Sequence, residues 1–140
     1  MATNMEEIYK ALSSMIFIGN VTTVNEADAT AVVTVEDHDD KTTSALSVLQ
    51  RGSNESKDYW VPDIDDQVLC IRLPNKSGRG FNSGFIVGAF YSDIHTIPAG
   101  ANSNTRVLDT PGNLLLKIGG NLTIKAGTID IAGGGDVVVG

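Results

Sequence analysis

The sequence predicts a mostly β protein with three parts: a short N-terminal helix, a small barrel and a repetitive β tail. An apolar stripe at helical spacing near the N-terminus indicates the helix. Strand-like segments follow it about eight to twelve residues apart, with turn residues between them, and indicate the barrel. Residues 112–140 contain short alternating segments that end at glycines, and this internal repeat indicates the tail.

Residues 1–15 form the predicted N-terminal helix. Either Thr3 with Glu6 or Asn4 with Glu7 fits a capping box at its start. The apolar side chains that share one face are Met5, Ile8, Leu12 and Ile16. We expect this face to pack against the rest of the chain.

Residues 16–97 form the predicted barrel. Its strands are expected at residues 16–25, 29–35, 43–50, 67–73 and 85–91. A turn at Glu26-Ala27-Asp28 joins the first two strands into a hairpin, and a glycine-rich loop at residues 75–84 precedes the last strand. Five strands in this order are typical of a small Greek-key barrel of the OB type, and the pattern also fits other small barrels.

Residues 98–111 form a linker, and residues 112–140 form the tail. Period-two alternation places ten apolar side chains on one face of the tail: Leu114, Leu116, Ile118, Leu122, Ile124, Ala126, Ile129, Ile131, Val137 and Val139. Leaving them in water forfeits roughly 15–30 kcal/mol, an upper estimate that exceeds the ~5–15 kcal/mol net stability of a typical domain. The cover is either the body of the same chain or the same stretch of other copies. Repetition favours other copies, because a symmetric assembly needs matching faces at regular intervals. The repeat does not determine the number of copies.

Composition excludes several classes of protein. The chain has 140 residues with 41% hydrophobic residues, which suffices for one core domain plus an extension. A net charge of −7 argues against nucleic-acid binding. The single cysteine excludes an internal disulfide framework and a cysteine-based zinc site. No apolar run approaches the ~18 residues of a membrane span and the acidic N-terminus is not a signal peptide, so we expect a protein made in the cytoplasm.

Three groups of residues are candidate sites of chemistry, and none predicts an enzyme. Glu36–Asp40 (EDHDD) could be a metal loop, but Lys41 stands where a calcium ligand should be, so a solvated loop is expected. The aspartates within residues 63–66 share one turn and have no separate partner for glycoside hydrolysis. Cys70 lies in a strand without a nearby histidine and reads as a buried structural thiol. We therefore expect no catalytic residue, metal site or cofactor.

The segment WVPDIDDQVLCIRL, followed by a loop and by GFIVGAFYS, resembles the phage baseplate assembly protein V family. These proteins are the central spikes of contractile phage tails and phage-like bacteriocins, and they are related to the type VI secretion spike. The resemblance is carried by Trp60, Pro62, Asp66, Gln67, Val68, Gly88, Tyr91 and Pro98. It covers residues 15–98, and the repeat after Pro111 looks like the stem of the family.

The resemblance implies an OB-fold collar followed by an intertwined trimeric β-helix or β-prism stem. The core of the trimeric stem would be Leu114, Leu116, Ile118, Leu122, Ile124, Ile129, Ile131, Val137 and Val139. The implied function is that of a structural spike or hub in a virion or phage-like particle, which plugs the tail tube and pierces the target cell envelope. Implied partners are two further copies of the chain, the tail tube or hub, and baseplate proteins.

Two positions depart from the family pattern. Asp65 stands where the family usually has glycine, so the turn before Gln67 is expected to differ. Many relatives end in a His-x-His tip that binds iron, but the two histidines here, His38 and His95, lie far upstream. Either a separate tip protein caps the stem or the stem is blunt. The alternative function is an OB-fold module for oligosaccharide or single-stranded nucleic acid with an oligomerising tail, and the acidic balance and 6% aromatic residues argue against it.

Overall fold

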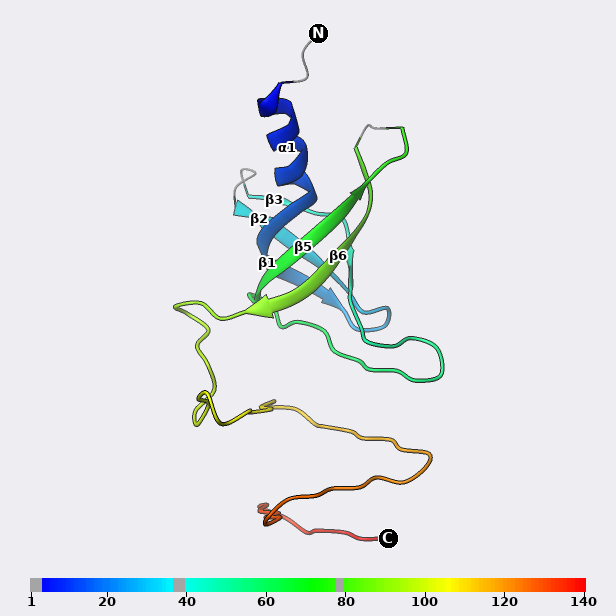
Figure 1. Cartoon of the computed structure of the whole chain (residues 1–140), viewed down its shortest axis with the longest axis vertical. Helices are drawn as coiled ribbons and strands as arrows, with labels where there is room; N and C mark the ends of the chain where they lie inside the picture. Colours follow the sequence, from blue (N-terminus) through cyan, green and yellow to red (C-terminus); the bar gives the residue numbers. More distant parts are fainter. Residues whose placement is uncertain (1–3, 37–39, 78–79) are drawn as a thin grey trace.

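The computed structural model describes residues 4–36, 40–77 and 80–140. Its elements are α1 (Met5–Met15), β1 (Ile16–Asn25), β2 (Thr30–Val35), β3 (Lys41–Thr42), β4 (Leu46–Val48), β5 (Gln67–Pro74) and β6 (Phe81–Phe90). The strands form a barrel, α1 extends from one end of it, and the C-terminal stretch lies beyond the other end (Figure 1). The molecule is therefore elongated, with the barrel between its two extensions.

The barrel is closed by five of the strands. The strand order is β1-β5-β6-β4-β2, and a further antiparallel pairing of β1 with β2 completes the ring. Only the pairing of β4 with β6 is parallel among the described ladders, and the short β3 lies on the outer edge of β2. This arrangement confirms the prediction of a mostly β protein with a small closed barrel preceded by one short helix, and it is consistent with a barrel of the OB type.

Alternating side chains fill the inside of the barrel. The buried core consists of Phe17, Val21, Ala31, Val33, Val35, Leu46, Val48, Val68, Cys70 and Ile86. Leu46 and Val48 point inward together, as the period-two pattern predicts. Gly19 has no side chain because a Cβ there would collide with the side chain of Val33 and the backbone of Thr34, where β1 crosses β2. The core is thus complete within one chain.

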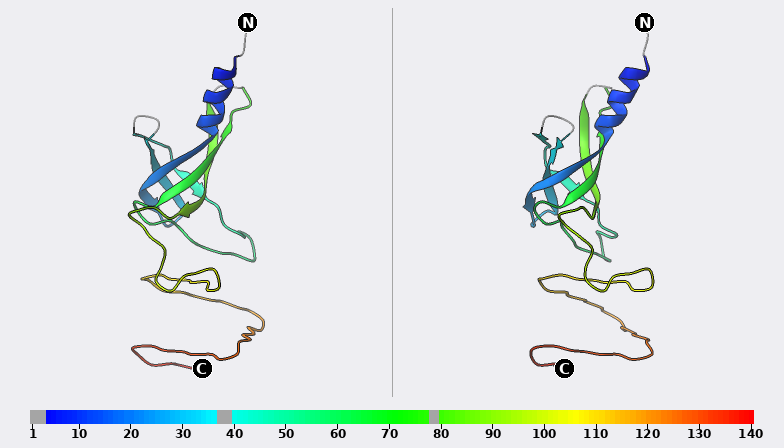
Figure 2. Two further views of the ribbon diagram at one scale, coloured as in Figure 1. Left: turned by 60° about the vertical axis from the view of Figure 1, so that its left-hand side comes forward. Right: turned by 90° about the vertical axis from the view of Figure 1, so that its left-hand side faces the viewer.

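The N-terminal helix begins as the sequence predicts but does not pack as expected. Asn4 is the N-cap, and its side-chain Oδ1 accepts a hydrogen bond of 2.9 Å from the backbone N–H of Glu7. No helix residue is buried, and Ile8 and Leu12 are 45% and 53% exposed. The apolar face is therefore not covered by the chain as expected, because α1 runs into β1 without a loop and points away from the barrel (Figure 2). Its contact with the sheet lies at its end, where the Arg72 Nε–H donates to the carbonyl oxygen of Ser14 at 3.2 Å.

Two strands, β4 and β6, differ from the sequence-based prediction by more than one residue at a boundary. The strand expected at residues 43–50 is shortened to β4, because the backbone and the hydroxyl of Thr43 both bond to Val33 and hold the chain beside β2. The strand expected at 85–91 begins earlier, at Phe81, because its pairing with β5 continues to the Pro74–Phe81 register. The glycine-rich loop is correspondingly shorter than residues 75–84.

The C-terminal stretch, residues 112–140, is extended and contains no strand of its own. It bends at Gly112, Gly119-Gly120, Gly127 and Gly134-Gly135, and the runs between the bends are straight. These runs pass back and forth below the barrel, one beyond the next (Figures 1 and 2). Every residue of the stretch is exposed, so the barrel of the same chain does not cover its apolar face.

Candidate functional site

The tryptophan and proline of the family-like motif hold a loop against the barrel. The Trp60 Nε1–H donates to the carbonyl oxygen of Leu49 at 2.9 Å. The side chain of Gln50 accepts from the Trp60 N–H at 3.0 Å and donates to the Trp60 carbonyl at 2.8 Å. Trp60 packs against the core and Pro62 is buried. Both residues have a packing role in this chain.

The acidic residues of the motif form a turn that is bonded to itself and to β1. The Asp63 N–H donates to Asp66 Oδ2 at 2.8 Å, and the Asp66 N–H donates to the Asp63 carbonyl at 3.0 Å. Val21 bonds to the backbone of both Asp65 and Asp66. Asp65 has φ +75°, a left-handed conformation that glycine adopts most easily, so a glycine would fit this position without strain. The three aspartates therefore shape a turn, Asp66 through its carboxylate and Asp63 and Asp65 through their backbone.

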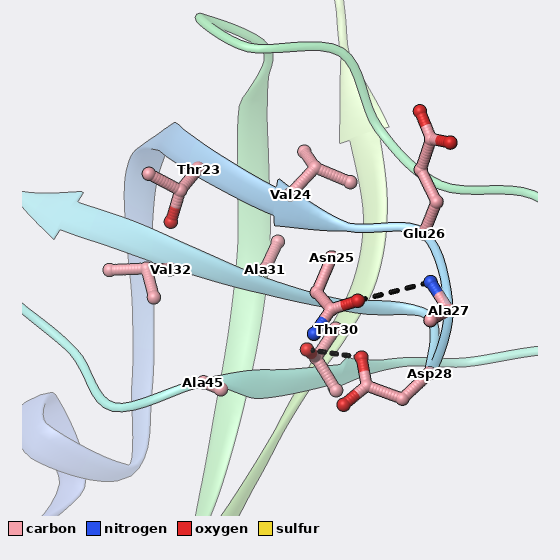
Figure 3. Close-up of a pocket in the computed structure, with 10 residues that line it drawn as sticks. All are labelled: Thr23, Val24, Asn25, Glu26, Ala27, Asp28, Thr30, Ala31, Val32 and Ala45. Carbon is pink, nitrogen blue, oxygen red and sulfur yellow. Dashed lines mark hydrogen bonds between the residues drawn. The ribbon is translucent and has the colours of Figure 1, made fainter.

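A hollow with a volume of about 930 Å³ lies at the tip of the β1–β2 hairpin (Figure 3). Its polar groups hold the turn: Asn25 Oδ1 accepts from the Ala27 N–H at 3.0 Å, and Thr30 Oγ1 donates to Asp28 Oδ1 at 2.7 Å. The carboxylates of Glu26 and Asp28 point in different directions, so they do not converge on a common position (Figure 3). The arrangement provides no pair for general acid–base chemistry.

A second hollow, of about 560 Å³, contains Glu36, Asp65, Asp93 and His95. The His95 N–H donates to Ser92 Oγ at 3.1 Å, which ties this segment to its own turn. Within the described ranges, no group of three or more His, Cys, Asp or Glu residues could hold a metal ion. The middle of the proposed metal loop Glu36–Asp40, residues 37–39, lies outside the described residues.

Cys70 is the buried thiol that the sequence predicts. It is fully buried in β5 and faces the barrel core. Desolvation raises the pKa of the Cys70 thiol from 9.0 to about 12, and the positive charge of Arg72 offsets part of that increase. The thiol is protonated at neutral pH and is therefore a poor nucleophile.

The outside of the barrel carries an apolar surface on β1, β5 and β6, which we call the outer sheet face. Its residues are Ile16, Ile18, Leu69, Ile71, Leu73, Phe85, Val87, Gly88 and Phe90. Ile18 lies directly opposite Leu69, which in turn lies opposite Gly88. Sequence reasoning missed this face, although the unbroken runs IFI, LCI and FIV were a signal, since strands buried on both sides lose their alternation.

The exposed apolar residues continue from the outer sheet face into the C-terminal half. Tyr91, Ile94 and Ile97 follow β6 directly and are 57–85% exposed. The nine residues predicted as the stem core are also exposed: Leu114, Leu116, Ile118, Leu122, Ile124, Ile129, Ile131, Val137 and Val139. Exposed apolar surface of this extent is typical of an interaction site. The chain thus has two candidate assembly surfaces, one on the barrel and one on the C-terminal stretch.

The fold and these surfaces define a class: a small closed β-barrel with an extended, repetitive C-terminal stretch and exposed apolar surface on both parts. A comparison with models of known protein families gives no match, and a comparison with curated proteins gives none either. In the described part of the chain, no helix is long and apolar enough to cross a membrane.

Proposed function

We propose that this chain is a non-enzymatic structural protein, the trimeric central spike or hub of a contractile tail baseplate. The observation that carries the proposal is the C-terminal stretch, whose apolar residues have no cover in one chain and whose bends recur at glycines. When such runs are buried in an assembly, their backbone groups need hydrogen-bond partners, and strands of other copies can supply them. The motif from Trp60 to Tyr91 adds the resemblance to the spike family.

In this proposal three C-terminal stretches wind around one axis and form the intertwined stem. Closure around the axis pairs the strand edges, and the nine core residues from Leu114 to Val139 face inward. The barrels form a collar that plugs the tail tube, and the stem points toward the target envelope. A stiff, hydrogen-bonded needle concentrates the force of the contracting sheath on a small area. A separate tip protein caps the stem, or its end is blunt.

The first test is the mass of the purified chain in solution. At low micromolar concentration we expect light scattering to give the mass of three 14.8 kDa chains. A monomeric mass would contradict the spike proposal outright, because the apolar face would then be stable in water.

A second measurement separates this proposal from an OB-fold binding module. The outer sheet face contains no lysine or arginine, and the chain has a net charge of −7. We therefore expect no retention of single-stranded oligonucleotides at physiological salt. Salt-sensitive oligonucleotide binding by the trimer would favour the binding module instead.

A further inference from the structure

Gly88 occupies a place in β6 that the packing within one chain does not explain. Gly84, in the same strand, must be glycine because a Cβ there would collide with the side chain of Leu46. At Gly88, by contrast, a Cβ would meet no described atom within 4 Å. Glycine inside a strand costs roughly 0.5–1 kcal/mol relative to alanine and often marks the close approach of another backbone. The β5–β6 register also shifts beside Gly88, and a bulge is the other usual place for a strand glycine, but Gly88 does not have the positive φ that only glycine adopts easily. The open space above Gly88 is therefore free to receive a group from outside the chain.

The surroundings of Gly88 show what kind of surface approaches it. Leu69 lies opposite Gly88 and Ile18 lies opposite Leu69, so a row across three strands is apolar and has a gap at one end. The adjacent row contains Ile16, Ile71 and Phe85 and is also apolar. One side chain of the partner can enter the gap at Gly88, and the partner side chains next to it can pack on the two apolar rows.

The exposed area limits the strength of this contact. Ile16, Ile18, Leu69, Leu73, Val87 and Phe90 are 36–56% exposed, which amounts to about 500 Å² at roughly 180 Å² for a large apolar side chain. A stable pair of independent proteins buries about 800 Å² per partner. The outer sheet face is therefore too small to hold a free partner tightly, but it suffices between molecules that are already joined.

The C-terminal stretch would join the copies through the proposed stem. Copies connected through their stems keep their barrels near one another, and such tethering acts like a millimolar local concentration. The exposed apolar residues run from β6 through Tyr91, Ile94 and Ile97 toward the stretch, so the two surfaces are continuous along the chain. The face is also uncharged, which suits contact between copies that each carry a net charge of −7.

We infer that the outer sheet face, centred on Gly88 and the Ile18–Leu69 pair, is a second interface between copies of this chain, through which the barrels pack against each other. The inference rests on the proposed trimer and adds a contact that the stem does not supply. It assigns Gly88 the role of a gap that receives a side chain of the neighbouring barrel.

Thiol labelling in the full-length assembled protein tests the contact. Ile18→Cys places a thiol on the outer sheet face, and Thr23→Cys places one on an exposed part of β1 that pairs with β2 instead of β5. Each labelling rate is divided by the rate of the same variant unfolded in urea. We expect the Ile18→Cys thiol to be protected at least tenfold more than the Thr23→Cys thiol. The background from Cys70 is low because that thiol is buried.

Adding Gly88→Val to the Ile18→Cys chain is the matched perturbation. Valine has room in the isolated barrel and suits a strand, so the barrel should fold. We expect it to fill the gap and bring the labelling rate within twofold of the Thr23→Cys reference, while Thr23→Val added to the same chain leaves the protection unchanged.

The outcomes separate the two proposals. A trimer whose Ile18→Cys thiol reacts as fast as the Thr23→Cys thiol overturns the barrel interface and leaves the spike proposal standing. Protection that survives Gly88→Val also overturns the interface as described, because the gap would then have no role. A monomeric mass overturns both.

Discussion

Cys70 and Asp65 are two residues at which the fold imposes a measurable cost. Cys70 sits among apolar side chains, where its thiolate would lose its solvation. Asp65 has a positive φ, which a residue with a Cβ adopts at some expense. Both costs follow from the immediate surroundings of one residue, so each can be tested with substitutions at that residue alone.

The pKa of Cys70 predicts how stability depends on pH. The folded-state pKa of about 12 exceeds the ordinary cysteine pKa of 9.0, so burial favours the neutral form of the thiol. The stability that the neutral Cys70 thiol contributes is fully present below about pH 9. It is lost as the pH rises toward 12, because Cys70 of the unfolded chain ionises in that range. We expect the free energy of unfolding, measured in urea, to fall more steeply above pH 9 for the wild type than for Cys70→Ala. Parallel pH profiles for the two proteins would contradict this expectation.

Asp65 predicts an asymmetric response to substitution. Asp65→Gly should leave stability unchanged or raise it by up to about 1 kcal/mol, because glycine has no Cβ penalty at positive φ. Asp65→Val should lower it by about 1–2 kcal/mol, since a β-branched side chain tolerates this conformation poorly. Denaturant unfolding of the three proteins at pH 7 measures both changes. Equal stability of the glycine and valine variants would show that the turn relaxes.

At the level of elements, the sequence predicted the parts that depend on local pattern. The capped helix, the β1–β2 hairpin and the inward residues of β4 and β5 follow from periodicity and turn chemistry. The early start of β6 was missed because its pairing with β5 is a contact distant in sequence, and Phe81 precedes a glycine-containing stretch that reads as loop. The outer sheet face was missed because these strands have apolar residues on both sides. Without alternation between apolar and polar residues, the sequence does not show which side faces the core.

The facing of the C-terminal runs remains a prediction, since all their side chains are exposed in one chain. Ile124 and Lys125 are neighbours, and alternation places them on opposite faces of the stem. Ile124→Lys would bring three ammonium groups into a dry core, where each unpaired charge costs at least several kcal/mol, so it should fray or abolish the stem. Lys125→Glu should change stability by no more than about 0.5 kcal/mol per chain.

Melting curves and solution masses of both variants measure this difference. The Lys125→Glu protein is the matched control, because it changes an adjacent charge in the same run. Tolerance of both substitutions, or damage by Lys125→Glu alone, would show that the assignment of inner and outer faces is reversed or absent.

For the whole molecule, the barrel and the C-terminal stretch differ in how much of their apolar surface one chain buries. The barrel has a complete core within one chain, whereas residues 112–140 are exposed throughout and lie beyond the end of the barrel (Figure 1). We therefore expect folding to depend on the first part and the proposed assembly to depend mainly on the second. The linker that joins them begins near Pro98, shortly after β6 ends.

Truncation after Asp109 tests this division. The fragment keeps α1 and the five barrel strands, so it should be soluble and fold. We expect weaker trimerisation and lower resistance to heat and detergent than in the full chain, because the stem contacts are gone while the small outer sheet face remains. Differential scanning calorimetry and light scattering compare the two proteins. An unchanged unfolding temperature would show that the stem contributes nothing to stability.

The glycine bends also have a genetic consequence. The first two blocks of the C-terminal stretch, GNLLLKIG and GNLTIKAG, are equal in length, and the chain bends at the glycines that bound them. A tandem duplication of one block would add one more run and one more bend without changing any residue of the barrel. The reach of the molecule can thus lengthen in steps of a single block, by a mutation that leaves every existing codon intact.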